Sequence, residues 1–129
     1  MKFKWTLASA FVALFWMNSS FAAGLGQDMW HLYKNYSAFK KAKEAPVALT
    51  ALTEMQQAAT DAKTNVPMKL IGQPDNSPQM QEYQQTFDHL LGEINQATDL
   101  VKAGNLAQAQ AQVVPNIDKI RDEGHKKFR

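Results

Sequence analysis

The sequence predicts an all-α protein, folded as an antiparallel, up-down-up-down four-helix bundle. Apolar residues recur at alternating steps of three and four in four segments, which cover residues 25–39, 48–66, 80–101 and 106–128. This spacing is typical of amphipathic helices, and none of the segments shows the strict alternation of a strand. The first and third links between segments are short, which favours antiparallel neighbours.

The breaks between the segments carry helix start and stop signals. Pro46 is suited to the first turn of the second helix. The long connection of residues 67–78 ends in Ser77 and Pro78, which we expect to be the N-cap and the first helical residue of the third helix. Gly104 is expected to end the third helix in the left-handed conformation.

One irregularity falls in the fourth segment. Ala109, Val113 and Ile117 follow two consecutive steps of four, and Pro115 lies between the last two. We call the line of apolar residues along each helix its seam. An extra seam residue and a proline inside the helix predict a kink or a local bulge there.

Residues 1–22 have the features of a secretory signal peptide. Lys2 and Lys4 precede a 12-residue apolar stretch, and small residues allow cleavage before Ala23. The stretch is too short for a membrane anchor, which needs about 20 residues. We therefore expect an exported, monomeric protein of one domain, residues 23–129, with no membrane contact after cleavage.

The charge of the mature part gives no reason to expect a nucleic-acid partner. Cleavage removes two lysines and no acid, which leaves 12 basic residues against 12 acidic ones. Local basic clusters remain: Lys40, Lys41 and Lys43 form one, and Arg121, Lys126, Lys127 and Arg129 form the other. Such clusters are commonly solvated helix ends, although the second could also dock an acidic redox partner.

Cysteine is absent from the chain. Disulfides, thiolate metal sites and iron–sulfur clusters are therefore excluded, and so is covalent haem attachment through a C-x-x-C-H motif. Any haem would have to be bound non-covalently.

The predicted topology brings Met29 and His125 to the same pole of the bundle. Met29 lies four residues after Leu25 and His125 four before the chain end, so both lie about 6 Å inside that pole. A thioether and an imidazole are a known axial pair for haem iron. A seam methionine is nevertheless usually core, and a histidine near a helix end is usually a surface residue.

Apolar and flat side chains gather at the same pole and could enclose a porphyrin. They are Leu32, Tyr36, Met55, Pro67, Met68, Leu70, Tyr83 and Phe87. Arg121 and Arg129 lie one turn on either side of His125 and could pair with propionates.

Four groups of residues also match a known pattern in order and spacing. They are Asp28-Met29 with Leu32; Leu49-Thr50 and Leu52-Thr53-Glu54-Met55; Ser77-Pro78-Gln79-Met80 with Phe87-Asp88, Leu90 and Gly92; and Ala109-Gln110-Ala111 with Arg121, His125, Lys127 and Arg129. Together they resemble the soluble cytochrome b562 family, whose architecture is the four-helix bundle.

The resemblance implies an electron carrier of the bacterial periplasm that holds one haem b and passes electrons to a redox protein partner. Met29 and His125 match the family's iron ligands. The family's pocket positions fall on Leu32, Met55, Pro67, Tyr83, Phe87 and Arg121. The chain departs from the family at Gly124, where a tyrosine is usual, and at Trp30, which replaces an acid. It also has an extra residue near Pro115 and another within residues 67–78.

Two other functions fit parts of the sequence. A haem-free helical bundle, acting as a periplasmic adaptor or stress protein, would keep the seams but would not need Met29 and His125 at one pole. A copper or zinc protein could use these two residues with His31, His89 and nearby methionines. However, His31 faces away from Met29, and His89 lies about nine residues from the pole. The sequence shows no nucleophile–base arrangement of an enzyme.

Overall fold

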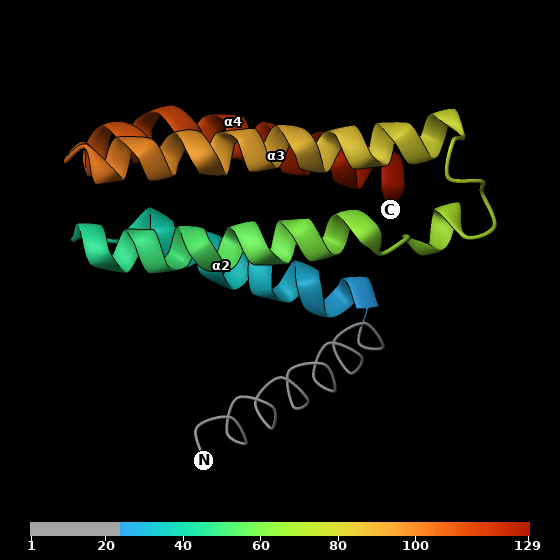
Figure 1. Ribbon diagram of the computed structural model, residues 1–129, viewed down its shortest axis with the longest axis horizontal. Helices are drawn as coiled ribbons and strands as arrows, with labels where there is room; N and C mark the ends of the chain where they lie inside the picture. The colour runs from blue at the N-terminus through green and yellow to red at the C-terminus, as the bar shows by residue number, and fades with distance from the viewer. Residues whose placement is uncertain (1–23) are drawn as a thin grey trace, which may run out of the picture.

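The computed structural model describes residues 24–129 as four helices that run alternately up and down (Figure 1). The expected signal peptide and its cleavage site before Ala23 lie outside the described residues. The N-terminal helix covers residues 24–41 and is followed by α2, Ala45–Thr64. A short 3-10 helix, Met68–Leu70, precedes α3, Pro78–Lys102, and α4 is Leu106–Phe128.

Hydrogen bonds and ion pairs connect each helix to its two neighbours and confirm the predicted bundle. Asn65 Nδ2, just after α2, donates to Asp28 of the N-terminal helix, and Lys63 of α2 pairs with Asp88 of α3. Asn116 of α4 donates to Glu93 of α3. Gln110 of α4 closes the ring, because its amide donates to the carbonyls of Phe39 and Ala42.

The predicted helix ends are largely confirmed. The Ser77 hydroxyl accepts the Met80 amide at 3.2 Å, and Pro78 begins α3. Gly104 adopts a φ of 88°, the left-handed conformation that lets the chain turn into α4. The prediction was wrong at Val66, because α2 ends at Thr64 and Val66 is 41% exposed. Pro67 restricts the residue before it to extended backbone, which keeps Val66 out of the helix.

Pro115 does not produce the expected bulge. α4 is α-helical from Leu106 to Phe128, with no wider turn around the proline. Proline removes the donor to the carbonyl four residues earlier, which here belongs to the exposed Ala111. Water can therefore solvate that carbonyl, and the helix continues.

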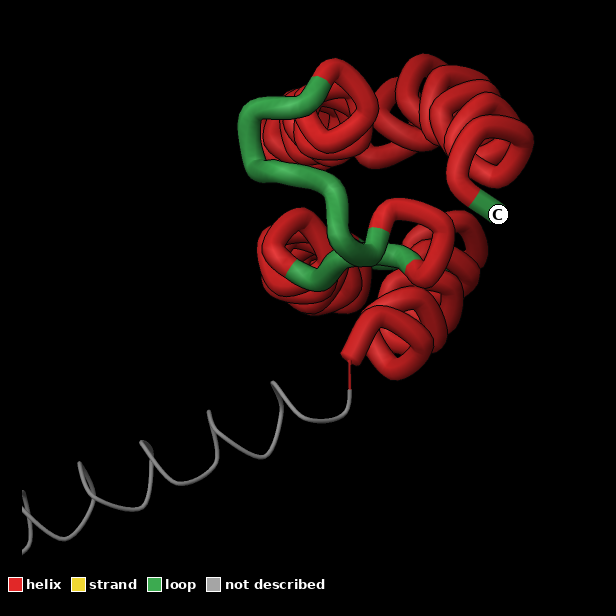
Figure 2. Tube along the Cα trace, turned by 90° about the vertical axis from the view of Figure 1, so that its right-hand side faces the viewer, coloured by secondary structure: helices red, strands yellow, loops and turns green. Residues whose placement is uncertain are grey.

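The two poles of the bundle are packed differently. At the pole of the two short links, alanines such as Ala48, Ala51, Ala97 and Ala109 are at most 3% exposed and let the helices approach closely. The opposite pole carries the start of the N-terminal helix, the connection from α2 to α3 and the C-terminus. Figure 2 looks onto this end and shows the connection crossing it. We call it the open pole, because a cavity lies there.

Candidate functional site

A cavity of about 940 Å³ lies between the helices at the open pole. This volume falls near the upper end of the 300–1,000 Å³ that ligand pockets usually enclose. All four helices and the segment after α2 contribute to its wall, which is mainly apolar and aromatic. The open pole therefore leaves room for a large, mainly apolar ligand.

All eight residues that the sequence singled out lie in the wall of this cavity. They are Met29, Leu32, Met55, Pro67, Tyr83, Phe87, Arg121 and His125. Of the other residues expected at this pole, Tyr36 and Met68 also line the cavity, whereas Leu70 is buried and does not line it. The structure thus brings the candidate residues together around one cavity.

Met29 and His125 differ in their surroundings. Met29 is half-buried and packs against the core, whereas His125 is exposed near the end of α4. Partial desolvation, followed by the positive charges of Arg129 and Arg121, lowers the pKa of His125. The imidazole is therefore neutral over a wider pH range than an ordinary histidine, and only neutral imidazole can bind a metal ion.

Tyr83 forms a rigid part of the wall. Its ring packs edge-on against Phe87 and Phe128, with centroids 5.0 Å and 5.3 Å apart. Its hydroxyl donates to the carbonyls of Ala62 and Asn65, at 2.7 Å and 2.8 Å. Burial, followed by the negative charge of Asp28, raises the Tyr83 pKa. The neutral hydroxyl thus fixes the end of α2 against α3.

Asp28, the neighbour of Met29, anchors the N-terminal helix to the end of α2. Asp28 accepts a hydrogen bond of 2.6 Å from Asn65 Nδ2. Burial raises the Asp28 pKa, and the Asn65 bond opposes that effect because it stabilises the carboxylate. Asp28 and Tyr83 both bind Asn65, so the turn that carries Met29 is tied to the end of α2.

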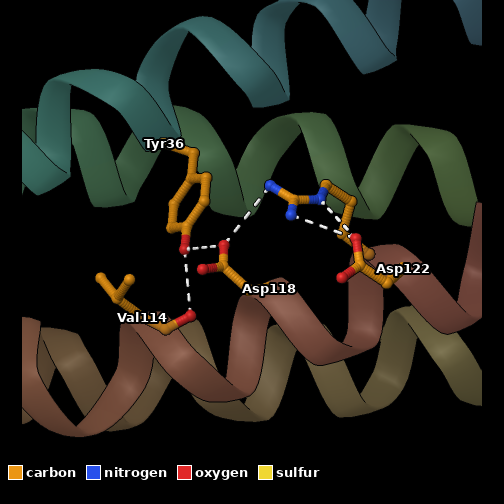
Figure 3. A network of polar contacts seen from close by, with 5 residues as sticks. Tyr36, Val114, Asp118 and Asp122 are labelled. Atoms are coloured by element: carbon orange, nitrogen blue, oxygen red, sulfur yellow. Dashed lines mark hydrogen bonds and ion pairs between the residues drawn. The ribbon is translucent and has the colours of Figure 1, made fainter.

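The charged side chains that line the cavity are all basic. Lys69, Arg121 and Arg129 line it, and no aspartate or glutamate does so among residues 24–129. Arg121 is paired with Asp118 and Asp122 just outside the wall (Figure 3). Within the basic cluster expected near the C-terminus, Lys127 is paired with Glu82. Arg129 and Lys126 form no ion pair within the described part of the chain.

Several wall residues were not predicted from the sequence. Leu25, Ile117 and Phe128 occupy seam positions near the open pole, so their place could have been anticipated. Trp30 and Tyr33 lie outside the seam and are about 60% exposed, and their tilted rings lie 6.1 Å apart between centroids. No periodic signal marks them, because they border the cavity from its rim.

The histidines of the copper or zinc alternative are separated. His31 and His89 do not line the large cavity; His89 borders a second, polar cavity of about 190 Å³ between α3 and α4. Within residues 24–129 no three histidine, aspartate or glutamate side chains are grouped so that they could hold a metal ion. Nor is any helix in this range long and apolar enough to cross a membrane.

Comparison with known proteins agrees with this class of helical bundle with a ligand cavity. The family model for cytochrome b562 matches residues 24–129. Two relatives from Yersinia pestis are called probable soluble cytochrome b562 1 and 2. The first is 31% identical over 110 residues, covering 85% of this chain and 86% of the relative. The second is 33% identical over 108 residues, covering 84% of each.

The chain belongs to the cytochrome b562 family. Proteins of this family are haem-binding electron carriers and not enzymes. The resemblance found in the sequence is thereby confirmed.

Proposed function

We propose that this protein carries electrons by binding one haem b non-covalently, with Met29 and His125 as the axial iron ligands. The observation that supports this most strongly is the apolar cavity of about 940 Å³ whose wall contains both side chains. No cysteine is present for covalent attachment. When bound, haem supplies an iron that takes up and releases one electron.

The residues of the wall have distinct roles in this proposal. The Met29 thioether is a soft ligand that favours the ferrous state and raises the reduction potential. His125 is the stronger ligand, and its lowered pKa keeps the imidazole available. Leu32, Met55, Pro67, Tyr83 and Phe87 exclude water from the porphyrin. Arg121, with Lys69 and Arg129, offsets the charge of the propionates.

Titration of haem into the purified apoprotein tests the proposal. The wild type should bind one equivalent with the spectrum of six-coordinate haem. His125→Ala should weaken binding strongly, whereas Met29→Ala should retain haem at a lower potential. His89→Ala is the matched control, because His89 lies outside the cavity, and it should behave as the wild type.

If both ligand variants kept the wild-type spectrum and potential, this axial pair would be wrong. If the wild type bound no haem, the haem-free bundle would be favoured.

We also propose that the protein acts in the periplasm, after removal of residues 1–22. The relatives are named as soluble proteins, and the sequence of residues 1–22 has the pattern of a signal peptide. The intact mass of exported protein should correspond to a start at Ala23, or one residue later at Gly24. Exported protein that retains residues 1–22 would contradict this localisation.

A further inference from the structure

A polar cluster connects the N-terminal helix to α4 (Figure 3), and two of its members, Tyr36 and Arg121, line the cavity. The Tyr36 ring is 5% exposed and lines the cavity. Its hydroxyl points to α4, where it donates to Asp118 Oδ1 at 2.7 Å and approaches the Val114 carbonyl at 3.1 Å. The short bond to a carboxylate is charge-assisted and is among the stronger hydrogen bonds in proteins.

Arg121 lies between two carboxylates that are held differently. Asp118 Oδ1 is 3.4 Å from Arg121 Nη1, and Asp122 Oδ1 is 3.1 Å from both Nε and Nη2. Asp118 is fixed by Tyr36. Asp122 has the more exposed side chain, and among residues 24–129 only Arg121 is bonded to it. Asp122 makes the shorter contacts to Arg121, but within this part of the chain only Asp118 has a second partner, the buried Tyr36. A well-solvated carboxylate contributes little electrostatic energy, whereas one that a buried partner holds acts from a constant position.

We propose that Asp118 is a positioning residue, which is held by Tyr36, fixes Arg121 at the cavity wall and lowers the reduction potential of the bound haem. The inference rests on the proposed function. A fixed negative charge beside the cavity stabilises the ferric state, which carries one more positive charge than the ferrous state. Lys40, whose Nζ lies 4.6 Å from the centre of the Tyr36 ring, adds a positive charge that all the variants below retain.

The matched pair Asp118→Asn and Asp122→Asn tests this role in the exported holoprotein. Both variants remove one negative charge from a partner of Arg121, but only the first removes the charge that Tyr36 fixes. Asp118→Asn should raise the midpoint potential. At a fixed applied potential, the ratio of ferrous to ferric protein should increase roughly twofold to fivefold, or about 20–40 mV at about 59 mV per tenfold. Asp122→Asn should change the ratio by less than half as much.

Tyr36→Phe then tests the connection between the two residues. Without the hydroxyl, Asp118 is free to turn into solvent. In the Tyr36→Phe background, Asp118→Asn should therefore shift the midpoint potential only as little as Asp122→Asn does in the wild type. A second readout needs no haem. Burial and then the Asp118 contact raise the Tyr36 pKa. Because alkaline pH destabilises the fold, the readout is the NMR chemical shift of the Tyr36 ring near neutral pH, which should change in Asp118→Asn apoprotein and change little in Asp122→Asn.

Two results would overturn the role of Asp118. Equal potential shifts in the two asparagine variants would show that the fixed position does not matter. A full Asp118→Asn shift in the Tyr36→Phe background would show that Tyr36 does not hold the carboxylate. Both results require haem to be bound, so they contradict only this inference. A wild type that bound no haem would contradict the proposed function itself, and this inference with it.

Discussion

The packed part of the bundle and its open pole are built from the same four helices, yet side chains fill the first and leave a cavity in the second. Of the five largest side chains that are less than 2% exposed, Phe39, Leu52, Ile94 and Val113 lie away from the cavity. The fifth, Met55, forms part of the cavity wall. At the open pole, partly exposed residues such as Leu25, Met29 and Leu32 pack against the core without filling the space between the helices. The fully buried side chains are thus concentrated in one part of the molecule and the cavity in the other.

The largest expected difference between the two regions comes from one substitution made in both. Leu52 is fully buried, so Leu52→Ala should cost about 3–5 kcal/mol of unfolding free energy in the apoprotein. Leu32 is only partly buried beside the cavity, so Leu32→Ala should cost less than half as much. Urea denaturation of both variants measures this. Equal losses would show that the open pole is as well packed as the rest.

Haem binding should remove much of the difference in stability between the two regions. A ligand that binds only the folded state at 100 times its Kd stabilises that state by about 2.7 kcal/mol. Without haem, amides near Met29 and His125 should exchange faster with solvent than those near Leu52 and Ile94. With haem, the first set should gain the most protection. Uniform protection in the apoprotein would show that the open pole is as stable as the packed part of the bundle.

Alkaline pH should destabilise the protein through two tyrosines, one of which closes the open pole. The pKa values of Tyr36 and Tyr83 are raised, primarily by burial. Below pH 10 both are protonated in the folded and unfolded states, so stability is unaffected. Above about pH 10 the unfolded state loses these protons first, so stability should fall by about 1.4 kcal/mol per pH unit for each tyrosine. Chemical denaturation against pH should show a shallower decline in Tyr83→Phe, and an unchanged decline would contradict the assignment.

The smallest effect concerns the glycine next to His125. A Cβ at Gly124 would meet only Thr86 Cγ2, at 3.7 Å, an ordinary contact. Gly124→Ala should therefore stabilise α4 by about 0.5–1 kcal/mol. Gly92→Ala is the control, because Gly92 lies inside α3 with open space around its Cβ position. Thermal unfolding measures both, and a destabilised Gly124→Ala would show that the last turn of α4 needs the glycine.

The fold was predictable from the sequence because its signals are local. Seam spacing defined the four helices, and Ser77 and Gly104 marked two of their ends. The same rules failed at Val66, and the bulge expected at Pro115 is absent, because the backbone at both places responds to its context. Pro67 excludes Val66 from α2, and an exposed helix face tolerates Pro115.

The site was predictable only in part. Topology indicates which residues share a pole, so Met29, His125 and the wall residues could be named. Whether side chains fill the space between them depends on packing in three dimensions, and spacing does not reveal it. The pairing of Tyr36 with Asp118 was also hidden, because they are 82 residues apart and Tyr36 looks like any other seam residue.

Iron X-ray absorption tests the central claim, that Met29 and His125 bind the iron of one haem at the open pole. The wild-type holoprotein should show one sulfur neighbour of the iron. Met29→Ala should lose it, whereas Met68→Ala should keep it, because Met68 lines the same cavity but is 87% exposed. A sulfur neighbour that persisted in Met29→Ala, or that was absent from the wild type, would contradict the account.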